Sequence, residues 1–383
     1  MSASTAALRT MLESNNPILD LRNPFMKKLL YETFYKQFCV GWDKASVDRG
    51  TSEMRRLGYA GVVLEYPLEV LVDASTKTDE SKDVEIWRSG MLETVAMAQP
   101  GDFLGLKWSG MGPAAMRRMA NNDDPSREMA EAMHAVCKAS RDRDIYLLPA
   151  AEKTWSLEGF HRWCMDLQRE YNVHGKSLLY GTYQAYLKQN PQNVAKHMEM
   201  AKAEGFTLGV KLVRGAYLGS EPRDLIWPNI ENTHEAYNTT ASALIHRDYN
   251  DFLRPATRGA TFPDINVVIA SHNAETVEKA QSLRQAQASR SEPLTPLVYA
   301  QLQGMADEVS CTLLAAAKAN EGKEKAVQEK VYKCTTWGEM HDCLNYLLRR
   351  ATENKDAASR TKSTREAMGV EIRRRMRSSL GMA

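Results

Sequence analysis

The sequence lacks long apolar runs, paired cysteines and a strong charge of either sign. No stretch approaches the roughly 18 consecutive apolar residues that a membrane-spanning helix needs, so we expect a soluble protein. The six cysteines are scattered, with no CxxC pair and no histidine at ligand spacing, which argues against a zinc site and a disulfide framework and fits a reducing compartment. The formal net charge of +2 gives no reason to expect a nucleic-acid partner.

The amino terminus lacks the charged and then apolar segments of a signal peptide. It has an early Arg9, several Ser and Thr residues, and then Glu13, so it is at best a remnant of a mitochondrial presequence. An ordinary frayed terminus fits these residues equally well.

Eight short apolar segments recur along the chain, each bounded by turn residues and separated from the next by enough residues for a helix. Several are apolar at consecutive positions, which is typical of strands covered on both faces. This rhythm predicts an α/β protein with a parallel sheet. The predicted strands are residues 60–66, 101–108, 144–150, 178–183, 207–214, 265–270, 296–301 and 331–334.

Polar residues at the strand ends favour a closed barrel over an open doubly wound sheet. In a closed barrel the carboxyl ends of the strands converge on one mouth, where barrel enzymes keep their active sites, whereas in an open sheet they spread along an edge. We therefore predict a TIM-like (β/α)8 barrel with its active site at that mouth. The strand-end residues are Glu65, Lys107, Glu152, Gln184, Lys211, Arg214, Ser271, His272, Asn273 and Gln301.

Two segments flank the predicted barrel domain of residues 59–353. Residues 1–58 have helical character and form a predicted N-terminal helical arm, with Phe25, Leu29, Phe34 and Phe38 available to pack against the barrel. Residues 354–383 form a basic C-terminal helical tail, which could suggest anionic lipid or nucleic acid. We favour a solvated helix because acidic residues are interleaved and no aromatic residue accompanies the cluster, which comprises Arg360, Lys362, Arg365, Arg373, Arg374, Arg375 and Arg377.

The last predicted helix before the tail places Tyr346, Arg349, Arg350 and Glu353 at i, i+3, i+4 and i+7, which is one helix face. Two adjacent guanidinium groups beside an aromatic ring make a good carboxylate site, because each can donate two charge-assisted hydrogen bonds. The alternative is an exposed arginine pair with Glu353 as its partner within the helix.

The segment GVKLVRGAY (residues 209–217) is a predicted strand that ends in two cations and a glycine. Lys211 and Arg214 offer positive charge to an anionic or electron-accepting partner, and Gly215 lets the backbone approach a bound group. Because both the GxGxxG and the GxxxxGK[ST] motifs are absent, a phosphate-bearing cofactor would be held in another way.

Several blocks resemble the signature blocks of proline dehydrogenases, in their fungal form. They are YGTYQAYL (180–187), KLVRGAYL (211–218), ASHNAETV (270–277), QLQGMADEVS (301–310) and YLLRRATENKDAASRT (346–361). The segments GYAGVVLEYPLEV (58–70) and NPFMKKLLYETFYKQFCVG (23–41) fit the same family, so the similarity runs over nearly the whole chain in the expected order.

The resemblance implies a distorted β/α barrel that binds FAD without a Rossmann domain. In that family, hydride leaves the carbon next to the ring nitrogen of proline for the flavin and gives Δ1-pyrroline-5-carboxylate. The electrons then pass to a membrane quinone, which implies at most peripheral membrane contact. The family is usually mitochondrial, and a cytoplasmic location stays open because no presequence is evident.

The resemblance also implies roles for individual residues. Arg349 and Arg350 would bind the substrate carboxylate together with Lys107, while Tyr346 would line the pocket and Glu353 would brace the arginines. The flavin would be held by Gln184, Lys211, Arg214, Gly215, Ala216, Ser271 and His272.

Two positions depart from the family. The third strand usually ends in Asp-Ala-Glu but here has Ala150 in place of the Asp, and the Tyr that usually stands four residues before Gly338 is Cys334. We expect these two residues and Leu302 to line a substrate pocket that is larger, less polar and poorer in aromatic contacts. The enzyme would then oxidise proline, or a hydroxyproline or other modified cyclic amine. A second hypothesis is a homologue that binds a ligand without catalysis.

Overall fold

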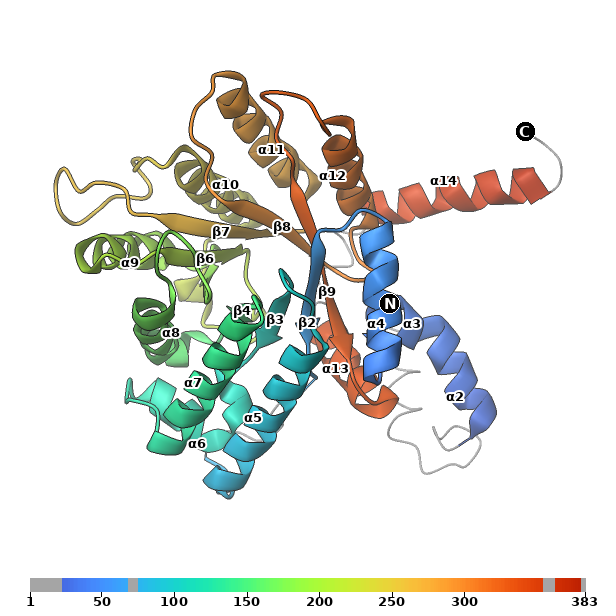
Figure 1. The fold of residues 1–383 in the computed structure, drawn as a ribbon, viewed down its shortest axis with the longest axis horizontal. Helices are drawn as coiled ribbons and strands as arrows, with labels where there is room; N and C mark the ends of the chain where they lie inside the picture. The colour runs from blue at the N-terminus through green and yellow to red at the C-terminus, as the bar shows by residue number, and fades with distance from the viewer. Residues whose placement is uncertain (1–22, 68–74, 354–361, 380–383) are drawn as a thin grey trace.

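The computed structural model describes residues 23–67, 75–353 and 362–379. At its centre, parallel strands are hydrogen-bonded in the order β4-β3-β2-β9-β8-β7-β6-β5, and a parallel bridge between Leu147 and Leu179 joins the two ends of this order. The predicted TIM-like barrel is therefore confirmed as a nearly closed barrel, with helices around it (Figure 1). Its strands are β2 (Gly61–Glu65), β3 (Phe103–Leu106), β4 (Tyr146–Pro149), β5 (Gly181–Gln184), β6 (Leu208–Val213), β7 (Ile265–Ala270), β8 (Leu297–Leu302) and β9 (Lys330–Trp337).

Helices follow the strands in the expected rhythm and cover the outside of the barrel (Figure 1). Apolar residues of the strands and of these helices form two large buried clusters on the outer side of the sheet. The helices are α4 (Lys44–Arg56), α5 (Glu80–Met97), α6 (Pro113–Ala120), α7 (Arg127–Asp142), α8 (Leu157–Tyr171), α9 (Asn190–Glu204), α10 (Ile230–His246), α11 (Ala274–Ser289), α12 (Asp307–Ala319) and α13 (Met340–Glu353). A further helix, α14 (Lys362–Ser379), follows them in the chain and does not cover the barrel.

An aromatic layer fills the inside of the barrel. The ring of Phe103 lies 4.9 Å from Tyr332, 5.0 Å from Tyr146 and 5.8 Å from Tyr180, measured between ring centroids. Burying each such ring contributes about 1.5–3 kcal/mol. Since inward positions alternate along a strand, the next inward residues toward the carboxyl ends are small or polar: Glu65, Gly105, Ala150, Lys211, Ala270 and Cys334.

The fourth predicted strand begins later than expected. Residues 178–180 precede β5, which starts at Gly181. The buried side chain of Asn172 makes the hydrogen bonds that a neighbouring strand would otherwise make: its Oδ1 accepts from the amides of Leu178 and Leu179 at 2.8 and 2.9 Å, and its Nδ2 donates to the Leu179 carbonyl at 2.7 Å. A side chain in place of a strand leaves no signal in the apolar pattern.

The N-terminal arm packs on α13. It comprises α2 (Pro24–Leu30), a π-helical turn (Tyr31–Tyr35), α3 (Lys36–Phe38) and a short strand β1 (Cys39–Gly41) that pairs with β9. Its residue Met26 is buried, and its buried residues Leu30, Tyr35 and Cys39 join residues of α13 in one apolar cluster.

Two expectations for the arm were wrong. Residues 39–41 form a strand although we predicted helix throughout, and Phe25 and Leu29 are 74% and 41% exposed although we predicted that they would pack. The inward residues instead follow a spacing of four, five and four, from Met26 to Cys39. The wider π-helical turn adds the extra residue to that spacing.

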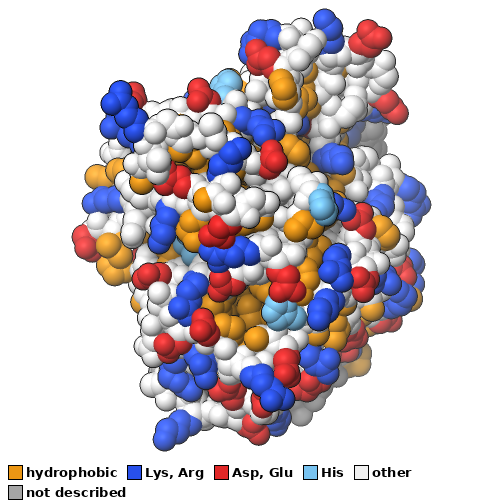
Figure 2. Space-filling model, turned by 60° about the vertical axis from the view of Figure 1, so that its left-hand side comes forward, with side chains coloured by type: hydrophobic (Ala, Val, Ile, Leu, Met, Phe, Trp, Pro, Cys, Tyr) orange, Lys and Arg blue, Asp and Glu red, His pale blue; other side chains and the backbone are white. Residues whose placement is uncertain are grey.

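Two surface features complete the fold. Helix α14 extends outward beside α12, and its exposed residues include Val370, Ile372 and Met376. Basic and acidic side chains are interspersed over the face in Figure 2, with no patch of one sign. Within the described ranges, no helix has the length and apolar character needed to cross a membrane.

Candidate active site

Glu65 and Tyr346 meet at the carboxyl end of the barrel. Glu65 is the last residue of β2, and Tyr346 lies in the second turn of α13. The Tyr346 hydroxyl donates a hydrogen bond of 2.9 Å to Glu65 Oε2. Gly105 on the neighbouring strand makes room, because a Cβ there would lie 2.5 Å from Glu65 Cγ. The predicted pocket residue Tyr346 thus lies at the mouth.

Cys334 and Lys211 belong to the same group of side chains. Cys334 lies among the inward residues of the barrel, and the register pairs it with Val63 and Leu302. Burial raises the pKa of the Cys334 thiol well above its ordinary value, the Glu65 carboxylate raises it further, and the positive charge of Lys211 opposes them. The Cys334 side chain is therefore a small, neutral thiol that lines the mouth of the barrel, and not a reactive thiolate.

Glu65 is a site residue to which sequence reasoning gave no role. The signal was present, because Glu65 stands at a strand end in the same pattern as Lys107 and Gln184. Its partner Tyr346 lies so far along the chain that only the fold reveals the pair.

Arg214 directly follows β6, and each of its three guanidinium nitrogens donates a hydrogen bond. It donates to His234 Nδ1 at 3.0 Å, Ser271 Oγ at 2.7 Å and Thr276 Oγ1 at 2.6 Å. The group also lies 4.4 Å from the centroid of the Tyr237 ring, at cation–π distance. These contacts hold a positive charge in one orientation next to Ser271, as an anionic ligand requires.

Gln184 organises the turn that contains Gly215 and Ala216. Its Oε1 accepts from the Ala216 amide at 3.0 Å, and its Nε2 donates to the Glu152 carbonyl at 2.9 Å. A Cβ at Gly215 would lie only 2.4 Å from the ring of Tyr186, so the turn can take this path only with glycine. The predicted cofactor residue Gln184, at the end of β5, therefore holds the turn that contains Gly215 and Ala216 in place.

His272 and Leu302 are in direct contact. The Leu302 amide donates a hydrogen bond of 3.0 Å to Nε2 of His272. His272 is partly exposed to solvent. Burial of its ring, followed by the positive charges of Lys333 and Arg214, lowers the pKa of His272 to about 4. The imidazole is therefore neutral at neutral pH.

Lys107 and Ala150 lie on the other side of the mouth, at the ends of β3 and β4. Lys107 Nζ lies 5.4 Å from the centroid of the Tyr217 ring, whose hydroxyl donates to the Ala151 carbonyl at 2.7 Å. Ala150 is half-buried and donates its amide to the Leu106 carbonyl at 2.7 Å.

Arg349, Arg350 and Glu353 lie in the last turns of α13, which ends at Glu353. Their side chains fall outside the part that the structure describes, so their predicted roles stay predictions. Helix α13 places them one to two turns beyond Tyr346 along the chain.

The donors at the mouth suit a flavin nucleotide. Two cations (Lys211 and Arg214), a neutral imidazole (His272) and a glycine turn at Gly215 converge there from β6 and β7. Phosphate oxygens and the carbonyl groups of an isoalloxazine ring accept hydrogen bonds from such donors, and a glycine lets the backbone approach them.

Comparisons with known proteins point to one family. Residues 53–363 match the family model described as proline dehydrogenase. A mitochondrial proline dehydrogenase 1 of Caenorhabditis elegans is 28% identical over 338 residues, covering 85% of this chain and 51% of that protein. A probable mitochondrial proline dehydrogenase of Schizosaccharomyces pombe is 32% identical over 247 residues (63% and 49%), and a hydroxyproline dehydrogenase of Bos taurus is 26% identical over 402 residues (91% and 82%).

Among solved structures, proline utilization A from Bdellovibrio bacteriovorus shares the fold with a TM-score of 0.69 at 16% identity, over 92% of this chain and 37% of that one. The chain spans about half the length of the C. elegans and S. pombe relatives.

Proposed function

Because the chain belongs to the proline dehydrogenase family, we propose that it oxidises proline, or a related cyclic imino acid, at the ring C–N bond by hydride transfer to a flavin. The observation that carries the proposal is the convergence of Gln184, Lys211, Arg214 and His272 on one barrel mouth. These residues come from three different strand ends, and together they supply the donors that a flavin nucleotide needs.

The proposed cofactor is FAD, which supplies the hydride acceptor when bound. Arg214, fixed by His234, Ser271 and Thr276, would meet negative charge without having to reorganise. The glycine turn braced by Gln184 would let the backbone lie close to the cofactor, and Lys211, Ala216, Ser271 and His272 would complete the site.

The substrate would be held by its carboxylate and its ring. Arg349 and Arg350, with Lys107, would bind the carboxylate, because two guanidinium forks and an ammonium match its charge and geometry. Glu353 would brace the arginines. Tyr346, oriented by Glu65, would line the ring pocket. Holding the substrate in one orientation is the main contribution of these residues to the rate.

Ala150, Cys334 and Leu302 favour a pocket with room beside the ring. The first two are small, and the thiol of Cys334 stays neutral beside Glu65. We propose that the substrate is proline or a ring-substituted proline such as hydroxyproline. The similarity to hydroxyproline dehydrogenase of Bos taurus supports hydroxyproline as a substrate.

The proposed electron acceptor is a quinone, and the proposed location is the mitochondrion. The names of the relatives in C. elegans and S. pombe support that location. We further propose the domain division of the sequence: an arm over residues 1–58, a catalytic barrel over 59–353 and a basic tail over 354–383.

The experiment that tests the function is reconstitution followed by a substrate screen. The purified chain, incubated with FAD, is expected to retain flavin absorbance after gel filtration. The complex is then mixed anaerobically with proline, hydroxyproline, pipecolate and N-substituted prolines. Reduction by any of them excludes the ligand-binding homologue without catalysis, whereas failure to retain FAD contradicts the proposal.

A further inference from the structure

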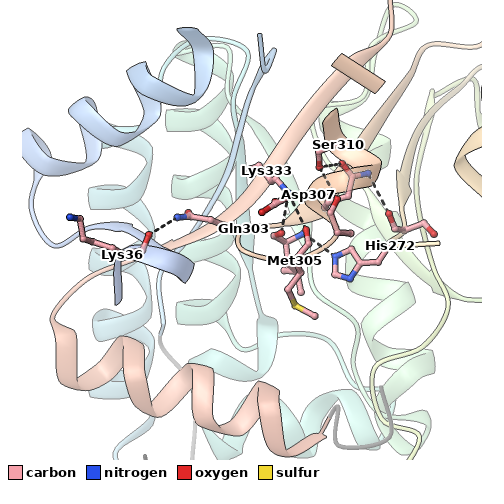
Figure 3. Close-up of polar contacts among 11 residues, drawn as sticks. Lys36, His272, Gln303, Met305, Asp307, Ser310 and Lys333 are labelled. Carbon is pink, nitrogen blue, oxygen red and sulfur yellow. Dashed lines mark hydrogen bonds and ion pairs between the residues drawn. The ribbon is translucent and has the colours of Figure 1, made fainter. Parts of the chain in front are cut away.

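Lys333 is a lysine whose side chain is almost completely buried, with only 4% of it exposed. It lies on β9, directly before Cys334. Its Nζ donates to the carbonyls of Leu302 and Met305, at 3.4 and 3.1 Å, and to Asp307 Oδ1 at 2.7 Å (Figure 3). A buried ammonium costs several kcal/mol unless its donors are satisfied, and here all three partners lie between β8 and the first residue of α12.

The loop between β8 and α12 (residues 303–306) is held from other sides as well. The Gln303 amide nitrogen donates to the Cys39 carbonyl of the arm at 3.3 Å, and its backbone N–H donates to the Cys334 carbonyl at 2.8 Å. Gly304 has a φ of +73°, and a Cβ there would lie 2.6 Å from the Gln37 carbonyl oxygen. The loop therefore occupies a narrow space between the arm and β9, and the ammonium group of Lys333 holds it there through hydrogen bonds.

The same segment determines the protonation of His272. The Leu302 N–H can only donate, so Nε2 of His272 must be its unprotonated acceptor. A neutral ring then carries its proton on Nδ1. Nδ1 makes no hydrogen bond to any residue that the structure describes, and it is therefore the nitrogen that can donate to a ligand at the mouth.

The residue before His272 is fixed through the strand that leads to the loop. The Gln301 amide nitrogen donates to the Ser271 carbonyl at 3.3 Å, and its oxygen accepts from Ser310 Oγ at 3.0 Å (Figure 3). The side chain of Ser271 in turn accepts from Arg214. A continuous set of hydrogen bonds thus runs from the β8–α12 segment to the proposed flavin site.

We propose that Lys333 is a positioning residue of that site: by binding the Leu302 and Met305 carbonyls, it fixes the Leu302 amide that selects the Nδ1–H form of His272. The expected effect of Lys333 on flavin binding rests on the proposed function. The effect of Lys333 on the tautomer of His272 does not. The ion pair itself adds little stability, because the Asp307 side chain is 58% exposed to solvent. The use of the ammonium therefore lies in the geometry of the loop that it organises.

The first test measures the tautomer directly. The chain is labelled with 15N-histidine, and the His272 signals are identified by their loss in His272→Gln. The expected wild-type ring is neutral with the proton on Nδ1, and Lys333→Met is expected to shift it toward the Nε2–H form. Lys330→Met, on the same strand but exposed, is the matched control and should leave the tautomer unchanged. An unchanged tautomer in Lys333→Met overturns the proposal.

The second test measures FAD binding to the apoprotein by titration calorimetry. Lys333→Met is expected to weaken binding about tenfold, as the loss of one well-placed hydrogen bond does. In the His272→Gln background, Lys333→Met should cost nothing further, because the lysine acts through the histidine. Equal losses in both backgrounds mean a merely structural role and contradict the proposal.

Failure of the Lys333 proposal can be distinguished from misfolding of the variant and from failure of the proposed function. If Lys333→Met does not fold, as judged by circular dichroism, Asp307→Asn replaces it, because it weakens the charged partner of Lys333 without emptying the buried position. A smaller shift of the tautomer in the same direction is then expected, and no shift overturns the proposal. If the wild-type chain binds no FAD, the proposed function fails, while the tautomer measurement still decides the role of Lys333.

Discussion

Glu65 and Cys334 are the residues that would set the chemistry of the proposed substrate wall. The Glu65 carboxylate accepts from the Tyr346 hydroxyl and lies beside the Cys334 thiol, whose pKa burial raises. A large aromatic side chain at position 334 would stand in the register opposite Val63 and Leu302. The thiol in its place leaves space beside a charged oxygen, which is a suitable environment for a substituent that can donate a hydrogen bond.

Tyr346→Phe tests the Glu65 contact. The ring is kept, but a hydrogen bond to a charged group worth about 1.5–3 kcal/mol is lost. We expect the KM for the cyclic amino acid to rise about tenfold or more while bound flavin stays constant. Tyr31→Phe, in the arm, is the control and should change neither quantity. A loss of flavin in Tyr346→Phe would mean that the helix faces the cofactor rather than the substrate.

Cys334→Tyr tests the size of the pocket. The phenol is expected to fill the space beside the ring and to raise the ratio of kcat/KM for proline over that for hydroxyproline. Cys311→Tyr, at an exposed position on α12, should leave the ratio unchanged. Unchanged specificity in Cys334→Tyr would place the substrate ring elsewhere.

At the scale of elements, the arm supports the helix that carries the proposed substrate residues. Tyr35 donates a hydrogen bond of 2.7 Å to the Gly338 carbonyl, just before α13, and Leu30 packs in the cluster with Cys343, Leu344 and Leu348. The arm and α13 thus stabilise each other, although they lie at opposite ends of the described chain.

A matched pair of substitutions tests this packing. Leu30 is 1% exposed and Leu29 is 41% exposed. We expect Leu30→Ala to lower the free energy of unfolding by about 2–5 kcal/mol, because it leaves a cavity. Leu29→Ala should change it by less than about 0.5 kcal/mol. Urea denaturation of both variants measures the difference, and equal effects would show that the arm does not pack through the Leu30 face.

These elements also show what sequence can and cannot predict. All eight barrel strands were predicted because buried parallel strands are apolar at consecutive positions, and their polar ends indicated the mouth. The strand β1 was missed because three residues are too few to show a period. The inward face of the arm was misjudged because the π-helical turn changes the spacing, and the partner of Glu65 depends on long-range packing.

At the scale of the whole molecule, two buried histidines couple stability to pH. His161 of α8 and His197 of α9 have ring centroids 4.9 Å apart, and His197 Nδ1 is 2.8 Å from the hydroxyl of Tyr183 on β5. Burial lowers the pKa of His161 to about 4 and that of His197 well below its ordinary value. Both rings are therefore neutral in the folded protein.

The sign of the pH dependence follows from these lowered values. The unfolded chain binds protons at His161 once the pH falls below 6.5, while the folded chain does not until about 4. Stability is thus fully present above 6.5 and is lost as the pH falls through that window, by up to a few kcal/mol. We expect His161→Gln to reduce the slope of unfolding free energy against pH between 6.5 and 4. Parallel curves for the variant and the wild type would contradict this assignment.

The most direct test of the central claim is an anaerobic titration of the FAD-loaded chain with proline and with hydroxyproline, followed by flavin absorbance. One of the two amino acids is expected to bleach the flavin fully at about one substrate molecule per flavin, because oxidation of one C–N bond releases two electrons. A flavin that stays oxidised with every cyclic amino acid tried would contradict it.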